Sequence, residues 1–367
     1  MLKHLSSLES DAQPLRLLEK SPFRTYTAQS GLIGETGSNV KSARAVFSSE
    51  QNHYIDKTNT VTARLTFKDA SGVVLTKLFS LEQDSYLMSV SYEIDNQTDT
   101  SWNGVFYSQI SRDNSDDPGV EGSSFGMQSY LGTATTTEDS HYKKISFKDI
   151  AKENFRYTQE GGWISMIQHY FVSAWIPDQK STQYYFTKKS KSGLNIIGFY
   201  SNQIEVQPGN AAVVSANFYA GPKNQYELAN YAAHLDLTVD YGWLWWLAQP
   251  LYAILYFFYS GELHFFDNVF QLFDGTNSWG LSIILLTLVV KIAFYKLAAT
   301  SYRSMANMRR VQPKLLAVRE RYANDKQAQS KAMMELYQKE KINPLGGCLP
   351  ILIQMPVFIA LYWALME

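Results

Sequence analysis

The sequence predicts a β-sandwich domain over residues 1–240, followed by α-helical transmembrane segments with a cytoplasmic helical hairpin between them. Three observations predict this fold class. Residues 20–220 contain short runs of alternating polar and apolar residues, broken by Gly, Pro, Asn and Asp, as in strands joined by turns. Residues 279–297 and 344–366 are two long apolar runs. The connection between these two runs is strongly basic.

The predicted sandwich is antiparallel, because strand-like runs are many and helical stretches are few. A turn is predicted at residues 69–72 and a short closing helix at 226–234. The predicted strands are 62–67, 73–81, 86–94, 162–176, 183–186, 193–200 and 211–219.

Residues 243–275 are rich in Trp, Tyr, Phe and Leu and are expected to form an interfacial amphipathic helix region. Aromatic rings favour the headgroup layer of a membrane, where the ring body is buried and its polar edge stays wet. A buried core helix is the alternative. Pro250, Gly261 and Asp267 interrupt the run before it is long enough to cross a bilayer.

Residues 279–297 and 344–366 are predicted transmembrane helices, because each is long enough to cross about 30 Å of hydrocarbon. Residues 298–343 are predicted to form an antiparallel helical hairpin, with a break at Asn324 and Asp325. Pro313 is expected to kink a helix or to begin one. An apolar seam with spacings of three and four residues should hold the hairpin together: Met308, Val311, Leu315, Val318 and Tyr322.

The distribution of Lys and Arg along the chain sets its expected orientation across the membrane. No Lys or Arg occurs from Trp243 to Val290, whereas residues 291–341 contain twelve Lys and Arg against four acids. Short basic connections between spans stay in the cytoplasm, so the β-domain is expected on the outer side. The first 20 residues contain no apolar stretch suited to a signal peptide or anchor. We therefore expect the sequence to be a fragment that lacks an upstream targeting segment.

Lys291 is the first candidate functional residue, because a lysine inside a membrane helix costs roughly 2.5–3.5 kcal/mol on insertion scales. Such a side chain needs a wet cavity or a polar partner. Thr287 lies one helical turn before Lys291, and Gln354 is a polar residue of the second span. We predict that these three residues line one polar groove. The alternative is that the long side chain of Lys291, only five residues before Lys296, reaches the cytoplasmic interface.

The basic hairpin has two interpretations. Lys and Arg near a membrane surface bind anionic lipids, at about 1 kcal/mol per residue. The same residues are also suited to dock ribosomal RNA or a targeting partner. The candidate docking residues are Arg303, Arg309, Arg310, Lys314, Arg319 and Arg321.

No catalytic residue, metal site or cofactor is predicted. The chain contains no HExxH, GxSxG or phosphate-loop motif, so an enzyme is disfavoured. His234, Asp236 and Asp240 have a spacing that matches no metal site and are expected to form a structural turn. Cys348 is the single cysteine, which excludes a disulfide within the chain and a cysteine-based metal site.

Several segments together resemble the YidC/Oxa-type membrane insertases. They are GGWISMIQHYFVSAWIP (161–177), LDLTVDYGWLWWLAQPL (235–251), WGLSIILLTLVVKIAFYKL (279–297), SMANMRRVQPKLLAVRER (304–321) and NPLGGCLPILIQMPVFIALYW (343–363). The resemblance covers nearly the whole chain. One departure is Lys291, where the family usually has arginine. Lysine keeps the positive charge but lacks the fixed donor fork of arginine.

The resemblance implies a multi-pass protein of the bacterial inner membrane with a periplasmic super-sandwich-like domain. It implies an insertase and chaperone for membrane proteins, acting alone or with the Sec translocon through a positively charged groove. Its implied partners are nascent membrane-protein clients, the Sec translocon, and a ribosome or targeting receptor at the hairpin, with no role for DNA. A membrane-anchored periplasmic carbohydrate-binding protein is the alternative. An ion or solute pore is poorly supported, because the two spans contain few polar residues.

Overall fold

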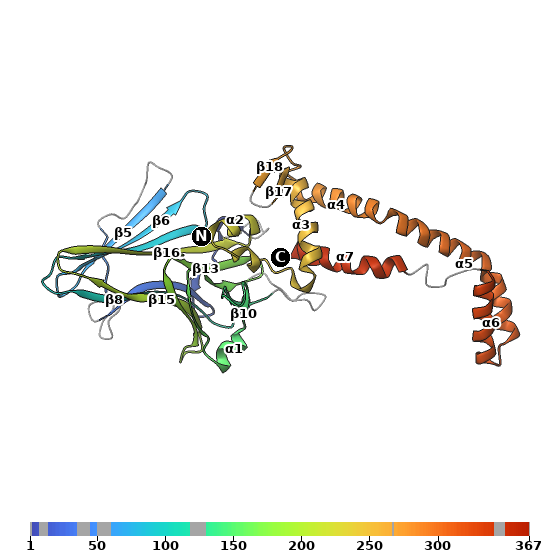
Figure 1. The fold of residues 1–367 in the computed structure, drawn as a ribbon, viewed down its shortest axis with the longest axis horizontal. Helices are drawn as coiled ribbons and strands as arrows, with labels where there is room; N and C mark the ends of the chain where they lie inside the picture. The colour runs from blue at the N-terminus through green and yellow to red at the C-terminus, as the bar shows by residue number, and fades with distance from the viewer. Residues whose placement is uncertain are drawn as a thin grey trace. The chain divides into compact units, whose positions relative to one another are not determined.

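The computed structural model describes residues 2–6, 14–34, 45–49, 60–117, 130–265, 268–340 and 349–366. The chain divides into two compact units, Met1–Asp240 and Tyr241–Glu367. Strands dominate the first unit and helices dominate the second (Figure 1).

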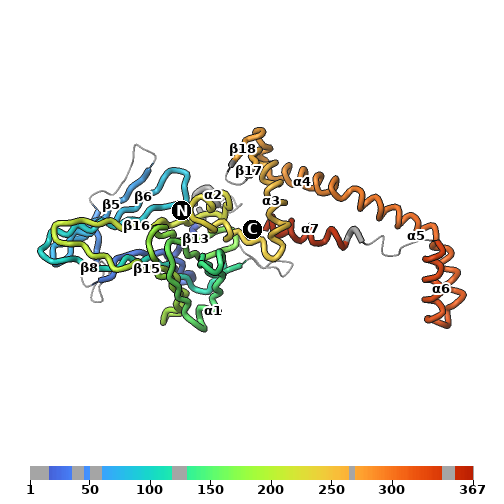
Figure 2. Tube along the Cα trace, viewed as in Figure 1, coloured from blue at the N-terminus to red at the C-terminus, as the bar shows by residue number. Residues whose placement is uncertain are grey.

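The first unit is a sandwich of two antiparallel sheets, which confirms the predicted β-sandwich (Figure 2). The larger sheet contains, in spatial order, β10 (Lys143–Ile145), β9 (Gly132–Thr135), β12 (Ile164–Ile167), β13 (Phe171–Pro177), β16 (Asn210–Pro222), β7 (Leu87–Asn96), β6 (Val74–Glu82) and β5 (Thr60–Lys68). The smaller sheet contains β11 (Arg156–Glu160), β14 (Thr182–Lys189), β15 (Asn195–Val206), β8 (Trp102–Arg112), β4 (Thr25–Ile33) and β3 (Glu19–Lys20). Outside the sandwich, β1 (Leu2–Ser6) pairs with β2 (Pro14–Leu15).

Side-chain alternation builds the core between the two sheets. On β8, Trp102, Phe106 and Ile110 are buried, whereas Asn103 between them is exposed. Phe106 meets Tyr92 of the opposite sheet with ring centroids 5.7 Å apart. Period-two burial of this kind is what turns an alternating sequence into a two-layer fold.

Most predicted strands are confirmed, with one split. The predicted run 162–176 is two strands, β12 and β13, which pair with each other across a turn closed by a hydrogen bond from Gln168 N–H to the carbonyl oxygen of Phe171. Both strands are buried on both faces, so their sequence has no polar alternation to mark the turn. Sequence reasoning also missed the long strands β4 and β8 and the shorter strands β1, β2, β3, β9, β10 and β11.

Short helices complete the sandwich unit. α1 (Phe147–Lys152) begins at a capping box formed by Ser146 and Asp149. The predicted closing helix is α2 (Gln225–Tyr231), followed by the 3-10 helix η1 (Leu235–Thr238). His234 separates the two, with a left-handed φ of 66°.

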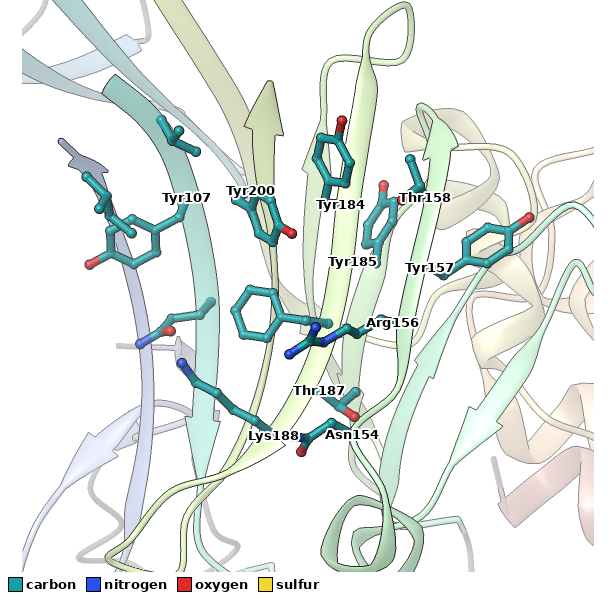
Figure 3. Close-up of a pocket in the computed structure, with 14 residues that line it drawn as sticks. Tyr107, Asn154, Arg156, Tyr157, Thr158, Tyr184, Tyr185, Thr187, Lys188 and Tyr200 are labelled. Carbon is teal, nitrogen blue, oxygen red and sulfur yellow. The ribbon is translucent and has the colours of Figure 1, made fainter. Parts of the chain in front are cut away.

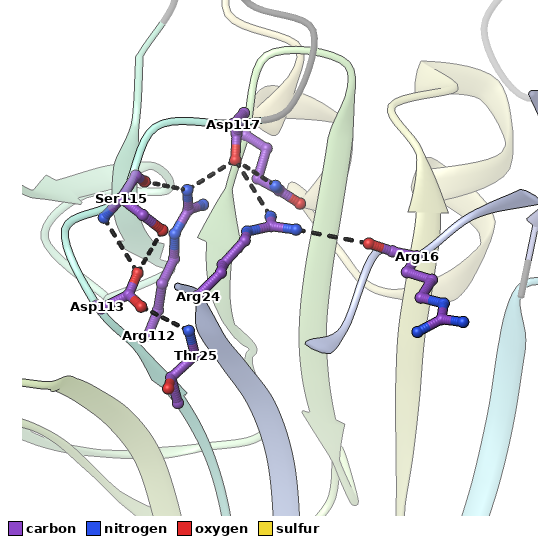
Figure 4. Close-up of polar contacts among 8 residues, drawn as sticks. Arg16, Arg24, Thr25, Arg112, Asp113, Ser115 and Asp117 are labelled. Carbon is purple, nitrogen blue, oxygen red and sulfur yellow. Dashed lines mark hydrogen bonds and ion pairs between the residues drawn. The ribbon is translucent and has the colours of Figure 1, made fainter. Parts of the chain in front are cut away.

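A buried ionic network connects the end of β8 with residues near the start of β4 and in the turn between β12 and β13 (Figure 4). The Asp117 carboxylate oxygen Oδ1 accepts hydrogen bonds from Arg112 at 2.7 Å, Gln168 at 2.5 Å and Arg24 at 3.5 Å. The side chains of Arg112, Arg24 and Asp117 are 0%, 8% and 10% exposed. Two guanidinium groups therefore depend on one carboxylate inside the protein.

Lys77 on β6 is a half-buried cation between the two sheets. Its Nζ donates to the carbonyl oxygen of Ser30 at 3.4 Å and lies over the rings of Phe79 and Tyr92. Burial lowers the pKa of Lys77 to about 8. An unfolded lysine keeps its proton to about pH 10.

We therefore expect the free energy of unfolding to rise between pH 8 and 10. In that window the unfolded chain binds more protons at Lys77 than the folded chain does. Above it, buried tyrosines such as Tyr92 reverse the trend, because burial raises the pKa of their hydroxyls. Pulse proteolysis of the full chain in urea measures this stability, and Lys77→Met should flatten the rise. If the free energy of unfolding of Lys77→Met rises with pH as steeply as that of the wild type, a group other than Lys77 causes the rise.

The second unit contains six helices among its described residues and one β-hairpin. They are η2 (Gly242–Leu244), α3 (Trp245–Ser260), β17 (Glu262–Phe265), β18 (Asn268–Gln271), α4 (Trp279–Ala293), α5 (Tyr295–Arg321), α6 (Lys326–Lys339) and α7 (Leu349–Met366). α3 packs against α4 and α7, and α5 packs against α6.

The predicted interfacial helix region 243–275 is helical only as far as Ser260. β17 and β18 then form an antiparallel hairpin, so the helical prediction is wrong for these residues. Gly261 ends α3 in a left-handed conformation, with a φ of 77°. A Cβ at Gly261 would lie 1.8 Å from the carbonyl oxygen of Phe273, so only glycine allows this close return of the chain.

The predicted span 279–297 is wrong as one continuous helix. α4 ends at Ala293 and α5 begins at Tyr295, and the two are bent by 63°. Phe294 lies at the bend, where its N–H still donates to the carbonyl oxygen of Val290. Within the described residues, no single helix has both the length and the apolar character to cross a membrane. The bent pair α4 and α5 meets that test together, and residues 352–366 form a shorter apolar helix.

The predicted hairpin is present as α5 and α6. Asp325 caps α6 by accepting hydrogen bonds from Gln327 N–H and Ala328 N–H, both at 3.0 Å. Pro313 lies inside α5, so the prediction that it begins a helix is wrong. Buried Val311 and Leu315 form the hairpin core with Met308, Met333, Leu336 and Tyr337. Residues 341–348, including Cys348 and the predicted start of the second span, lie outside the described residues.

Candidate functional site

Three helices of the second unit enclose a cavity of about 440 Å³. The walls come from α4, from the first turns of α5 and from α7. The residues that line it are Thr287, Val290, Lys291, Phe294, Tyr295, Ala298, Tyr302, Gln354, Val357, Phe358 and Leu361. They repeat at intervals of three and four along each wall, so each helix presents one face to the cavity.

The three residues predicted to share a groove all line this cavity. Thr287 and Lys291 come from successive turns of α4, and Gln354 comes from α7. Lys291 carries the one charge among the described residues of the lining. Much of the remaining wall is aliphatic or aromatic. The site therefore combines one cation and a few hydrogen-bonding groups with an apolar surface.

The bend at Phe294 shapes the site. α4 begins at a cap formed by Ser278, whose hydroxyl accepts from Leu281 N–H. α4 ends within three residues of Lys291, so this lysine lies in the last helical turn. The sequence suggested a lysine in the middle of a span, and the early end of α4 corrects that position. A cation near a helix C-terminus also interacts favourably with the helix dipole.

Lys291 and Thr287 are accessible in the described structure. Both are exposed, and Gln354 is half-buried. The Thr287 hydroxyl donates to the carbonyl oxygen of Ile284 at 2.8 Å, which leaves its oxygen free to accept only. The cavity thus offers donors from Lys291 and Gln354 and acceptors from Thr287 and Gln354.

Two tyrosines of the site were missed by the sequence analysis. Tyr295 and Tyr302 project from the first turns of α5, and both are about 70% exposed (69% and 70%). Their spacing continues the series that begins at Thr287 and Lys291, with steps of four, four and seven residues. That periodicity was available in the sequence, but the expected boundary at residue 297 placed Tyr302 in a different element.

The six candidate docking residues of the hairpin do not form one patch. At 100° per residue, Arg303, Arg310, Lys314 and Arg321 fall within about 40° of one another on α5. Arg309 and Arg319 lie on other faces. We call the four aligned residues the basic stripe. Lys314 also pairs with Glu340 of the hairpin at 2.5 Å, and that hydrogen bond holds the pKa of the Glu340 carboxyl below its usual range.

Metal binding has no support in the part of the chain that the structure describes. There, no group of three or more His, Cys, Asp or Glu side chains is placed to hold an ion. His234 stacks on His141 with ring centroids 4.0 Å apart. Asp240 forms an ion pair with Lys144, so these predicted turn residues are engaged in contacts within the sandwich unit.

Comparison with known proteins identifies the family. The YidC periplasmic domain family matches residues 1–254, and the 60Kd inner membrane protein family matches residues 271–367. A protein of Cellvibrio japonicus named membrane protein insertase YidC is 46% identical over 100% of this chain and 64% of its own length. One of the same name from Alcanivorax borkumensis is 44% identical over 98% of this chain and 63% of its own.

The chain belongs to the YidC family. It spans just under two thirds of the length of these two relatives. The family descriptions imply an inner-membrane protein with a periplasmic domain. Among solved structures, the GH36 α-galactosidase AgaA of Geobacillus stearothermophilus aligns with 58% of this YidC-family chain and 32% of its own, at 8% identity and a TM-score of 0.36.

Proposed function

We propose that this chain is part of a membrane protein insertase and chaperone, which helps inner-membrane proteins to insert and fold. One observation carries the proposal: Thr287, Lys291 and Gln354 line one cavity between α4, α5 and α7. Membership of the YidC family supports it, since the relatives compared above are named insertases.

The physical task of an insertase is to lower the cost of moving polar groups through hydrocarbon. A buried amide or hydroxyl without a hydrogen-bond partner costs several kcal/mol in an apolar medium. In the proposed mechanism the polar tail of a client enters the cavity and exchanges water for Lys291, Thr287 and Gln354. The client's apolar helix meanwhile moves into lipid beside α4 and α7. No covalent bond is made or broken in this process.

The proposed partners follow from the cavity and from the basic stripe. Nascent membrane-protein clients would enter the cavity, with the Sec translocon as a neighbour for some of them. The basic stripe of α5 is suited to anionic surfaces, either lipid headgroups or the ribosome and its targeting receptor. Lys314 of the stripe is paired with Glu340, and the three aligned arginines favour an extended anionic surface over a single point contact. In this proposal α4 with the first turns of α5, and α7, span the inner membrane, and the rest of α5 lies with α6 in the cytoplasm.

Site-specific photo-crosslinking tests the cavity as the entry point. A photoreactive amino acid is placed at Thr287 or Gln354 of the full-length protein, and ribosomes carrying a stalled client are added. Both positions should cross-link to the client's polar tail. Val289 and Leu352 are matched controls, because they are exposed residues of the same two helices and do not line the cavity.

The mapped position on the client decides the outcome. Tail cross-links from the cavity positions, with only apolar-helix cross-links from the controls, support the proposal. Equal labelling of the tail by all four positions would contradict it, because the cavity would then give no preferential contact.

A further inference from the structure

A second hollow, of about 700 Å³, lies on the outer face of the smaller sheet of the sandwich (Figure 3). Side chains from β4, β8, β11, β14 and β15 line it. Those of β14 show that the face is the outer one. Tyr184, Phe186 and Lys188 line the hollow from the outer face of β14, and Tyr185, which lies mainly in the core, also borders it.

Aromatic rings form a row across this face. Thr158, Tyr184, Tyr200 and Tyr107 are successive cross-strand partners on four strands. Tyr184 and Tyr200 are stacked, with centroids 5.0 Å apart and planes 9° apart. Tyr200 is 40% exposed, so the part of its ring that Tyr184 does not cover is available to a ligand.

The next row of cross-strand partners brings one of the two cations to the hollow. Arg156, Phe186, Gly198 and Gln109 are cross-strand partners in that order. Gly198 is buried and does not itself line the hollow. A Cβ at Gly198 would lie 2.3 Å from the carbonyl oxygen of Ser108, so glycine is needed for the close pairing of β15 with β8. Glycine inside a strand often marks a place where a ligand or another backbone approaches closely.

Two cations border the hollow, and no carboxylate does among its described lining residues. Arg156 and Lys188 are both exposed, and neither forms an ion pair with a described residue. Figure 3 shows both on the same side of the tyrosine row. An arginine fork and a lysine together favour a carboxylate or phosphate group.

The hollow suits a sugar better than a peptide strand. An extended peptide binds sheets by adding to a free edge, where its backbone continues the hydrogen-bond ladder. This hollow lies on a sheet face, where the strands already pair with one another. Recognition here must come from side chains alone. Flat rings offer an apolar surface to the C–H face of a pyranose, and Asn154 offers hydrogen bonds to its hydroxyl groups. The Gln109 Nε2 donates to Gln29 and the Tyr184 hydroxyl donates to Asn202, so these two side chains offer their oxygen atoms as acceptors.

We propose that the hollow over β8, β14 and β15 binds an anionic saccharide, with a pyranose ring stacked on Tyr200 and its carboxylate or phosphate held by Arg156 and Lys188. This site is separate from the helical cavity and does not depend on the insertase proposal.

Calorimetry on the full chain in detergent tests the site with defined probes. The first is a tetrasaccharide of alternating glucuronate and N-acetylglucosamine, and the second is the neutral N-acetylglucosamine tetramer. Glucose 6-phosphate and inorganic phosphate complete the set. The anionic tetrasaccharide should bind about tenfold or more tighter than the neutral one, because hydrogen bonds to an ionised group are roughly twice as strong as those between neutral groups. Its affinity should fall as salt is raised.

Variants separate the contribution of the two cations from that of the Tyr200 ring. Arg156→Gln with Lys188→Gln should abolish the preference for the anionic tetrasaccharide and leave weak binding of the neutral one. Tyr200→Ala should weaken both by roughly tenfold, whereas Tyr200→Phe should retain the stacking contribution. Lys189→Gln is the matched control, because Lys189 follows Lys188 on β14 and does not line the hollow.

Three results would overturn the proposal. The first is equal binding of the two tetrasaccharides. The second is inorganic phosphate binding as tightly as glucose 6-phosphate, which would make the hollow an anion site without a sugar. The third is tighter binding of an acidic peptide than of any saccharide. If glucose 6-phosphate binds in preference to the tetrasaccharide, the proposal stands with phosphate as the anionic group.

Discussion

Lys291→Glu is expected to slow insertion of clients with acidic tails by roughly five- to thirtyfold. Two unit charges about 4 Å apart interact by roughly 4 kcal/mol at an effective dielectric of 20. Because Lys291 is exposed, solvent screens much of this, and a net change of about 1–2 kcal/mol is expected. The assay is insertion of a tagged client in cells depleted of their own insertase and complemented with the full-length variant.

Charge exchange makes this test specific. A client whose tail carries lysine in place of aspartate should insert better with Lys291→Glu than with the wild type. Lys291→Arg should keep activity toward acidic tails, and Lys291→Gln should fall between. Lys296→Glu is the control, because Lys296 lies five residues further along and does not line the cavity. If Lys291→Glu inserts acidic and basic tails as the wild type does, charge at the cavity has no role in insertion.

Asp117→Ala is expected to destabilise the sandwich by about 3–5 kcal/mol, because it leaves two buried guanidinium groups without their shared carboxylate. Arg112 is fully buried and Arg24 nearly so. The network also joins the residues after β8 to the turn between β12 and β13 through Gln168. Its loss should therefore loosen both segments. Hydrogen exchange on the full chain, read by mass spectrometry, measures the opening of each.

Two companion variants define the cause. Glu93→Gln removes the partner of Arg64 in an exposed pair and should cost under about 1 kcal/mol. Combining Asp117→Ala with Arg24→Met and Arg112→Met should recover part of the loss, since no buried charge then lacks a partner. If Asp117→Ala costs no more than Glu93→Gln, the buried network contributes little to stability.

Much of the sandwich was predictable from local pattern. β5, β6, β7, β14, β15 and β16 all correspond to alternating runs, because a strand with one buried face imposes a period of two on its sequence. The boundary between β12 and β13 was not predictable in this way. Both strands are buried on both faces, so neither shows the polar–apolar alternation that would separate it from its neighbour.

The break at Phe294 shows a different limit of prediction from sequence. No proline or glycine stands between Trp279 and Leu297 beyond the first turn, and hydropathy alone joins these residues into one span. The packing of α4, α5 and α7 around the cavity is what distinguishes the two helices. The hairpin β17–β18 was missed for a related reason, since its aromatic residues resemble those of α3 and only Gly261 marks the change.

Some features of the candidate site were also predictable from the sequence, and others were not. The sequence by itself determined that Thr287 and Lys291 share a helical face, because residues four apart lie one above the other. It also determined that cations gather in the hairpin. Only the tertiary structure decided that Gln354 meets them across a cavity, that Tyr295 and Tyr302 join the site, and that Arg24 and Asp117 share a buried contact 93 residues apart. Local periodicity reports which face a side chain occupies, whereas a contact between distant segments depends on how whole helices and sheets pack.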